Sequence, residues 1–132
     1  MTEGSPARPA ILVSACLLGV RCNHRAEANP SDVVRALASR YRLIPVCPET
    51  MGGLATPRPA AERHSDGHVV TDGGVDVTDA FVRGARATVD VARAASVTEA
   101  VLKARSPSCG EAGVTTVALR TAGVRVRSEE DV

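Results

Sequence analysis

Aromatic side chains are almost absent from this chain of 132 residues, which has no Trp, one Tyr (Tyr41) and one Phe (Phe81). Domains that bind single-stranded nucleic acid usually stack the bases on several aromatic rings, so this mode of binding is disfavoured. The core must instead be built from Ala, Val and Leu. Hydrophobic residues still make up 44% of the sequence. A chain of this length and composition is expected to form one domain with a substantial core.

The sequence also lacks an excess of charge of either sign, and it has almost no lysine. The net charge is +1, and Lys103 is the single lysine among 16 basic residues. Domains that bind nucleic acid usually carry a strong basic excess or a basic stripe, so the composition gives no nucleic-acid signal. A small anionic ligand bound by one or two arginines is compatible with this charge.

Long hydrophobic runs are missing as well, because no apolar run approaches the roughly 18 residues of a membrane span. The Val13–Cys16 segment is similar to a lipoprotein processing site, but the apolar stretch before it is short and only Arg8 precedes it. We therefore expect a cytoplasmic protein with no membrane partner. Thiols stay reduced in the cytoplasm, where clustered cysteines more often bind metal or do chemistry than form disulfides.

The order of apolar runs and helical patterns predicts an α/β fold, a single-domain, Rossmann-like three-layer sandwich with a mostly parallel sheet of about four strands. Residues 1–9 are expected to form a disordered tail before a domain that spans residues 10–132. The glycine- and proline-rich stretch 48–74 is expected to be a functional loop, with Val69 and Val70 in a short edge strand or hairpin arm. The expected strands are 10–15, 42–46, 99–103 and 124–126, and the expected helices are 30–40, with Asn29 as N-cap, 76–95 and 114–122.

Three cysteines, Cys16, Cys47 and Cys109, each come after an apolar run that is expected to be a strand. Because the C-terminal ends of parallel strands share one edge of the sheet, where open α/β folds bind ligands, the three thiols would meet there. A buried core cysteine is the ordinary alternative for each of them. The neighbouring residues form loops, however, since Cys47 precedes Pro48 and Cys109 lies in a Ser-Pro-Ser-Cys-Gly segment. The pattern favours a shared metal or iron–sulfur site.

The spacing of these cysteines matches no zinc-finger pattern, because zinc fingers pair their ligands within a few residues. Three thiolates with no evident fourth ligand suit an iron–sulfur cluster that keeps one iron open. Cys22 is either a spare thiol near the site or an alternative ligand. His24 is a possible extra ligand, but a solvated loop histidine is the simpler interpretation, and the same holds for His64 and His68.

Six motifs along the chain, taken together, are highly specific for one protein family. They are Cys16-Leu17-Leu18-Gly19-x-x-Cys22, Pro45-Val46-Cys47-Pro48-Glu49, Gly52-Gly53-Leu54, Pro57-Arg58-Pro59 with Glu62, Gly74-x-Asp76-Val77-Thr78-x-x-Phe81-x-x-Gly84-Ala85, and Lys103-x-x-Ser106-Pro107-Ser108-Cys109-Gly110. From about residue 11 to residue 128, the sequence resembles a bacterial family long called a domain of unknown function, which includes the thiouracil desulfidases.

The resemblance implies a [4Fe–4S] cluster held by Cys16, Cys47 and Cys109, with a free iron that takes sulfur from the substrate. The implied substrate is a small molecule, a thiolated uracil base or its nucleoside or nucleotide. A soft thiocarbonyl sulfur prefers an iron–sulfur centre to a hard metal. Polarisation of the carbon–sulfur bond would let water attack the carbon.

Glu49 is then the candidate acid/base group, and Ser106 and Ser108 are candidates to orient water or the base. The ordinary alternatives are a solvated loop carboxylate for Glu49 and capping of the turn around Cys109 for the serines. Arg58 is expected either to face an anionic substrate or to close a salt bridge.

Two segments that border the expected site depart from the family pattern. The chain reads Asn23-His24-Arg25-Ala26 where the family usually has Arg-Tyr-Asp-Gly, and only three residues separate Gly110 from Val114, where members carry a longer glycine-rich loop. Two other functions are compatible with the residues. One is a noncatalytic metal- or cluster-binding module. The other is a thiol redox protein that uses Cys16 and Cys22, although their spacing lacks the usual Cys-x-x-Cys arrangement.

Overall fold

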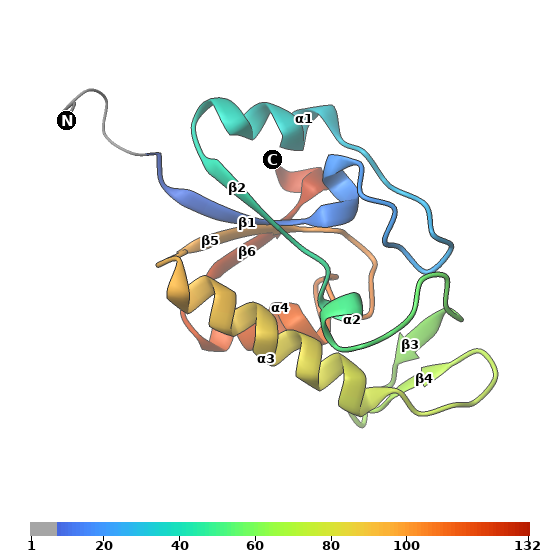
Figure 1. The fold of residues 1–132 in the computed structure, drawn as a ribbon. Coiled ribbons are helices and arrows are strands. Elements are labelled where there is room, and N and C mark those ends of the chain that lie inside the picture. Colours follow the sequence, from blue (N-terminus) through green and yellow to red (C-terminus); the bar gives the residue numbers. More distant parts are fainter. Residues whose placement is uncertain (1–7) are drawn as a thin grey trace.

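The main sheet has four parallel strands, and a computed structural model describes it within residues 8–132 (Figure 1). Most of the tail predicted for residues 1–9 lies outside the described residues. The strands lie in the order β2-β1-β5-β6, so β1 and β5 are central. Their bounds are β1 (Ala10–Ser14), β2 (Arg42–Val46), β5 (Glu99–Leu102) and β6 (Arg125–Ser128). The predicted α/β class with a mostly parallel sheet of four strands is confirmed.

Helices cover both faces of this sheet, as the three-layer prediction requires (Figure 1). Alternate residues of β1 point to opposite faces. Leu12 packs with residues of α3 (Thr78–Ala94) and α4 (Val114–Thr121), whereas Ile11 and Val13 pack with residues of α1 (Asp32–Arg35) and the 3-10 helix η2 (Ala36–Ser39). Because all three β1 side chains are fully buried, β1 is a continuous apolar run instead of an alternating one.

The first helix begins later than predicted and is capped by Ser31, not by Asn29. The Ser31 hydroxyl accepts a hydrogen bond from the Val34 N–H, and the α-helix passes into the 3-10 helix η2 after Arg35. The backbone N–H groups of Asn29 and Ser31 donate to carbonyls of η1 (Ala15–Leu18), the 3-10 turn that follows β1. This pairing holds the segment extended, so helical geometry starts only beyond it.

The glycine- and proline-rich stretch 48–74 has more regular structure than expected. It contains the short helix α2 (Pro48–Met51) and an antiparallel hairpin of β3 (Ala61–Arg63) and β4 (Val69–Thr71). The hairpin arm expected at Val69 and Val70 is therefore present. A 3-10 turn, η3 (Glu129–Asp131), follows β6 near the end of the chain.

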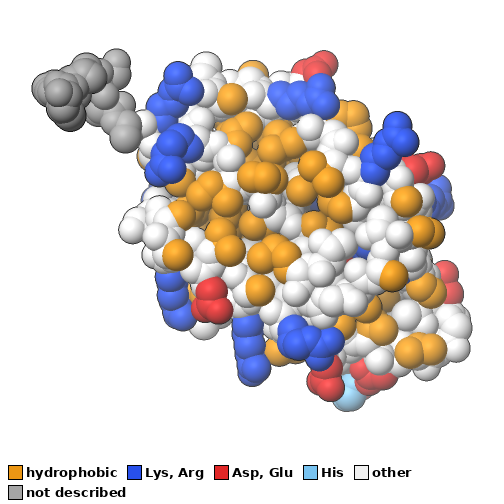
Figure 2. All heavy atoms as spheres, viewed as in Figure 1, with side chains coloured by type: hydrophobic (Ala, Val, Ile, Leu, Met, Phe, Trp, Pro, Cys, Tyr) orange, Lys and Arg blue, Asp and Glu red, His pale blue; other side chains and the backbone are white. Residues whose placement is uncertain are grey.

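The strand β2 forms one edge of the sheet and is only partly covered. Leu43 and Ile44 are half-buried and Pro45 is exposed, and Figure 2 shows hydrophobic side chains gathered across this face of the molecule. Proline has no N–H to offer a further strand, which discourages edge-to-edge pairing. Within residues 8–132, no helix is long and apolar enough to cross a membrane.

Candidate functional site

All four cysteines line one cavity of about 380 Å³ at the C-terminal edge of the sheet. Cys16 lies in η1 directly after β1, Cys47 lies between β2 and α2, and Cys109 lies in the loop between β5 and α4. The fourth, Cys22, comes from the long loop after η1. All four are free thiols, and only Cys47 is more than slightly exposed. The structure thus brings together the three cysteines selected from the sequence and adds Cys22 to them.

Cys47 is held in place by an unusually close approach of α2 to α3. It is the N-cap residue of α2, and Pro48 occupies the first helical position. A Cβ on Gly84 of α3 would lie 1.8 Å from the Pro48 carbonyl oxygen, and a Cβ on Gly52 would lie 1.9 Å from the Ala80 carbonyl oxygen. Only glycine permits these backbones to touch. Two of the sequence motifs therefore serve to seat the helix that follows Cys47.

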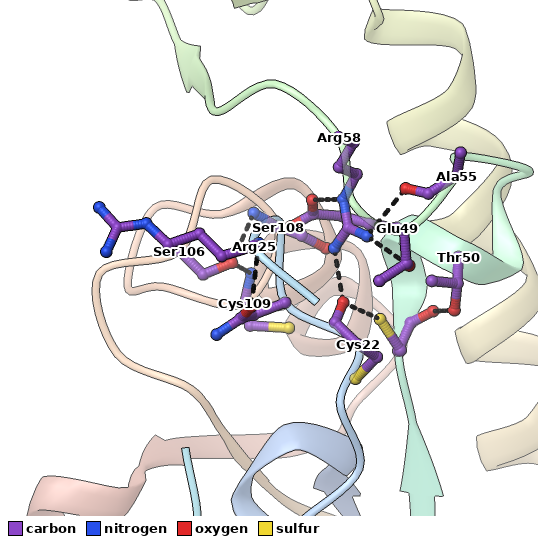
Figure 3. Close-up of polar contacts among 12 residues, drawn as sticks. Cys22, Arg25, Glu49, Thr50, Ala55, Arg58, Ser106, Ser108 and Cys109 are labelled. Atoms are coloured by element: carbon purple, nitrogen blue, oxygen red, sulfur yellow. Dashed lines mark hydrogen bonds and ion pairs between the residues drawn. The ribbon is translucent and has the colours of Figure 1, made fainter. Parts of the chain in front are cut away.

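The loop that carries Cys109 is organised by serine hydroxyls (Figure 3). The Ser106 Oγ accepts hydrogen bonds from the N–H groups of Ser108 (3.2 Å) and Cys109 (3.0 Å), so it caps this turn while also lining the cavity. The Ser108 hydroxyl lies 2.8 Å from Thr115 Oγ1 of α4, is buried, and does not line the cavity. Ser108 therefore anchors the loop to α4, and its predicted role in orienting water or the substrate base stays a prediction.

The thiols differ in how readily they ionise. Burial raises the pKa of Cys16, and burial raises the pKa of Cys109 to about 12 despite the nearby hydroxyls of Ser14 and Ser108. A hydrogen bond from the Cys22 thiol lowers the pKa of Cys47 to about 5, and the same bond raises the pKa of Cys22.

Cys47 changes its hydrogen-bond role with its charge. Its Sγ lies 3.7 Å from the Cys22 carbonyl oxygen, to which a neutral thiol would donate. A Cys47 thiolate cannot donate and instead accepts from the Cys22 thiol, which is the arrangement that lowers the pKa of Cys47. Cys47 is therefore the thiol in this cavity that most readily becomes a thiolate, the form in which cysteine binds metals.

Glu49 and Arg58 form a sheltered ion pair at the side of the cavity (Figure 3). The Arg58 Nε lies 2.9 Å from Glu49 Oε1, and the two side chains are 6% and 16% exposed, respectively. Arg58 also donates to the carbonyl oxygens of Cys22 and Ala55 and to the Thr56 hydroxyl. Arg58 therefore closes a salt bridge. Glu49 is not a solvated loop carboxylate, and its Oε2 has no hydrogen-bond partner among residues 8–132.

Other residues complete the lining. Asn29, expected to be a helix cap, and Lys103 both line the cavity, although sequence reasoning assigned neither a role there. Lys103 could have been selected as a candidate site residue because it is the single lysine of the chain. His24 lines the cavity too, whereas His64 and His68 do not.

Both segments that depart from the family pattern lie at or beside the cavity. Asn23 and His24 line it, and Ala26 has a left-handed backbone with φ of +59° at the position where the family usually has Gly. The short segment from Gly110 to Gly113 lines a neighbouring hollow that shares Ser106 with the cysteine cavity.

The donor set suits an iron–sulfur cluster. Within residues 8–132, no three or more His, Cys, Asp and Glu side chains are placed to hold a single metal ion. An iron–sulfur cluster is larger than a single metal ion, so its ligands lie farther apart than those of one ion. Sulfur donors select for such a group, and a cavity of about 380 Å³ is in the range of small-ligand sites. In donor chemistry and in space, Cys16, Cys47 and Cys109 fit a cluster.

Known proteins that are similar to this chain include an iron–sulfur enzyme. A family model described as 2-thiouracil desulfurase matches residues 11–131. A Bacillus subtilis (strain 168) protein named uncharacterized protein YbbK is 33% identical, in an alignment that covers 92% of this chain and 97% of the relative. The solved structure of the [4Fe-4S]-dependent thiouracil desulfidase TudS superimposes with a TM-score of 0.87 at 39% identity, covering 95% of this chain and 93% of TudS.

Proposed function

Because the chain belongs to the 2-thiouracil desulfurase family, we propose that it removes sulfur from a thiolated uracil or its nucleoside or nucleotide, using a [4Fe–4S] cluster held by Cys16, Cys47 and Cys109. The observation that carries the proposal is the meeting of these thiols, from the ends of three neighbouring parallel strands, in one cavity. Cys16, Cys47 and Cys109 would hold the cluster, whose open iron would supply Lewis-acid chemistry at the thiocarbonyl sulfur.

Glu49 is the proposed proton acceptor. The overall reaction converts a thiouracil and water into uracil, hydrosulfide and a proton, and nothing is oxidised or reduced. The attacking water must lose its proton, and Glu49 Oε2 faces this task without a competing hydrogen bond among the described residues. Arg58 fixes the carboxylate through the other oxygen. A base held in this way needs no reorientation before the reaction.

Ser106 is the proposed second polar group, because it lines the cavity beside Cys109. Its hydroxyl accepts two backbone hydrogen bonds, which leaves its own O–H free to donate to water or to the uracil ring of the substrate.

The first test is iron and acid-labile sulfide content after anaerobic purification. We expect about four of each per chain in the wild type and loss of both in Cys16→Ala, Cys47→Ala and Cys109→Ala. Cys22→Ser is the matched control, since it removes a thiol from the same cavity, keeps a hydroxyl that can donate to Cys47, and should keep its iron. A wild-type protein that cannot be loaded with iron would contradict the proposal.

The second test separates an enzyme from a module that only binds a cluster. Cluster-loaded Glu49→Gln should keep its iron and lose turnover of 2-thiouracil or 4-thiouracil by about 100-fold or more. Undiminished turnover in this variant would show that Glu49 is not the base.

The proposed location is the cytoplasm, because all four cysteines are free thiols, which a reducing compartment maintains. The proposed partner is the small-molecule thiolated pyrimidine itself.

A further inference from the structure

The single lysine of the chain lines the cysteine cavity with one unused donor. Lys103 Nζ donates to the Ala104 carbonyl oxygen (3.0 Å) and pairs with Glu129 Oε2 (3.3 Å). An ammonium group has three N–H donors, so one has no partner among residues 8–132. The side chain is 24% exposed, which places it at a sheltered wall of the cavity.

Contacts from three parts of the chain hold Lys103 in this position. Its backbone N–H donates to the Ser14 hydroxyl at the end of β1 (2.8 Å). The Glu129 carboxylate is fixed at both oxygens, because Oε1 accepts from the Ala104 N–H (2.8 Å) while Oε2 pairs with the ammonium. The turn η3 therefore serves to orient a cation beside the cysteines.

The choice of lysine at this position is itself informative. The chain uses arginine at every other basic position, including Arg58 in the same cavity. Arginine presents a planar fork that suits carboxylates, as its pairing with Glu49 illustrates, whereas the lysine ammonium is a compact point charge. Lysine is the better residue where a cation must approach one small anionic atom in a narrow space.

The order of the strands places this cation opposite the proposed base. In the sequence β2-β1-β5, Glu49 follows β2, Cys16 follows β1 and Lys103 follows β5. The segments that carry the Glu49 carboxylate and the Lys103 ammonium thus flank the segment that carries the central cysteine, and both side chains line the same cavity. Water loses a proton on the side of Glu49, and negative charge can be received on the side of Lys103.

We propose that Lys103 is a further catalytic residue, whose free N–H donates to the negative charge that builds on the substrate sulfur as the carbon–sulfur bond breaks. This inference rests on the proposed desulfidase function. The bond from water oxygen to carbon forms, and the carbon–sulfur bond breaks with its electron pair going to sulfur. One water proton goes to Glu49, and the other goes to the sulfur, which leaves as hydrosulfide. Lys103 keeps its own proton and supplies charge stabilisation only.

The test compares cluster-loaded wild type, Lys103→Gln, Lys103→Arg and Arg125→Gln. Arg125 is the control, because its side chain is 77% exposed on β6 and it does not line the cavity. Iron content, kcat and KM for 2-thiouracil, and affinity for added hydrosulfide by visible absorption would be measured for each. We expect Lys103→Gln to keep its iron and KM, lose about 100-fold in kcat, and bind hydrosulfide about tenfold more weakly.

Lys103→Arg keeps the charge but not the compact shape, so kcat should recover only in part, while Arg125→Gln should match the wild type. Wild-type kcat and hydrosulfide affinity in Lys103→Gln would overturn the inference alone. Loss of iron from Lys103→Gln would assign Lys103 a structural role and also overturn it. A loaded wild type that turns over no thiouracil would contradict the proposed function, whereas the hydrosulfide titration would still test Lys103.

Discussion

Two ion pairs of nearly equal length show how differently two regions of this molecule are built. In the cavity region, formed by the C-terminal ends of β1, β2 and β5 and their loops, Arg58 and Glu49 are 2.9 Å apart and 6% and 16% exposed. In the hairpin region, residues 61–76, His68 and Asp76 are 2.7 Å apart but 58% and 50% exposed.

The difference shows that burial, not distance, decides how much an ion pair contributes to stability. Water screens the exposed pair, so it contributes little to stability. Removing one partner of the sheltered pair leaves a charge that water cannot fully solvate. Substitutions in the cavity region should therefore be costly and those in the hairpin region mild, and the following predictions test this contrast.

The largest expected effect is that of Gly84→Ala. The new Cβ would meet the Pro48 carbonyl oxygen at 1.8 Å, so α2 and α3 must separate. We expect the free energy of unfolding to fall by about 3 kcal/mol or more, although alanine is the better helix former by about 1 kcal/mol. Urea denaturation measures this. Gly73→Ala in the hairpin region is the control, because nothing lies within 4 Å of its added Cβ. Equal stability of the two variants would refute the close approach.

A smaller loss is expected from Arg58→Met, which leaves the Glu49 carboxylate without its partner. Because Glu49 remains partly exposed, we expect a loss of about 2 kcal/mol, less than for a fully buried pair. The double variant with Glu49→Gln should recover part of this loss, and a double-mutant cycle in urea measures the coupling. Additive effects of the two substitutions would show that the pair is not coupled.

Ala26→Gly should stabilise the loop that lines the cavity. Ala26 has a φ of +59°, a left-handed conformation that costs a residue with a Cβ about 1 kcal/mol relative to glycine. The free energy of unfolding should therefore rise by about 1 kcal/mol. Ala28→Gly in the same loop is the control and should not stabilise, because Ala28 has no positive φ. The same result for both would mean that Ala26 is not strained.

The smallest effect belongs to His68→Asn in the hairpin region. The hydrogen bond with Asp76 raises the pKa of His68, and hydrogen bonds to Thr78 and His68 lower the pKa of Asp76 to about 2. The pair's contribution is thus fully present between about pH 4 and pH 6.5, the ordinary pKa values of Asp and His. It is lost as the pH rises through the raised pKa of His68 and as it falls through about 2.

Melting temperatures measured from pH 5 to pH 9 test this pH dependence. Wild type should exceed His68→Asn slightly at pH 5, and the difference should vanish at pH 9. His64→Asn is the control, since His64 has no carboxylate partner among the described residues. A difference that persists at pH 9 would exclude the ion pair as its cause.

Several features of the fold could be predicted because they depend on local patterns. The apolar run of β1, the helical spacing of α3 and the alternation of strands and helices indicate a parallel sheet. Parallel strands place their C-terminal ends together, so the meeting of Cys16, Cys47 and Cys109 could be foreseen. The start of the first helix could not, since tertiary hydrogen bonds to η1 competed with Asn29 as a cap.

Local sequence patterns are therefore enough to assign the class of the fold, the order of its elements and the strand ends at which chemistry is expected. Which side chains meet there depends on tertiary packing. It joined Arg58 to the Cys22 carbonyl across 36 residues and Lys103 to Ser14 across 89, and it turned Ser108 away toward α4. Periodicity and turn chemistry act within a few residues, whereas these contacts follow from how distant segments pack, which no local pattern encodes.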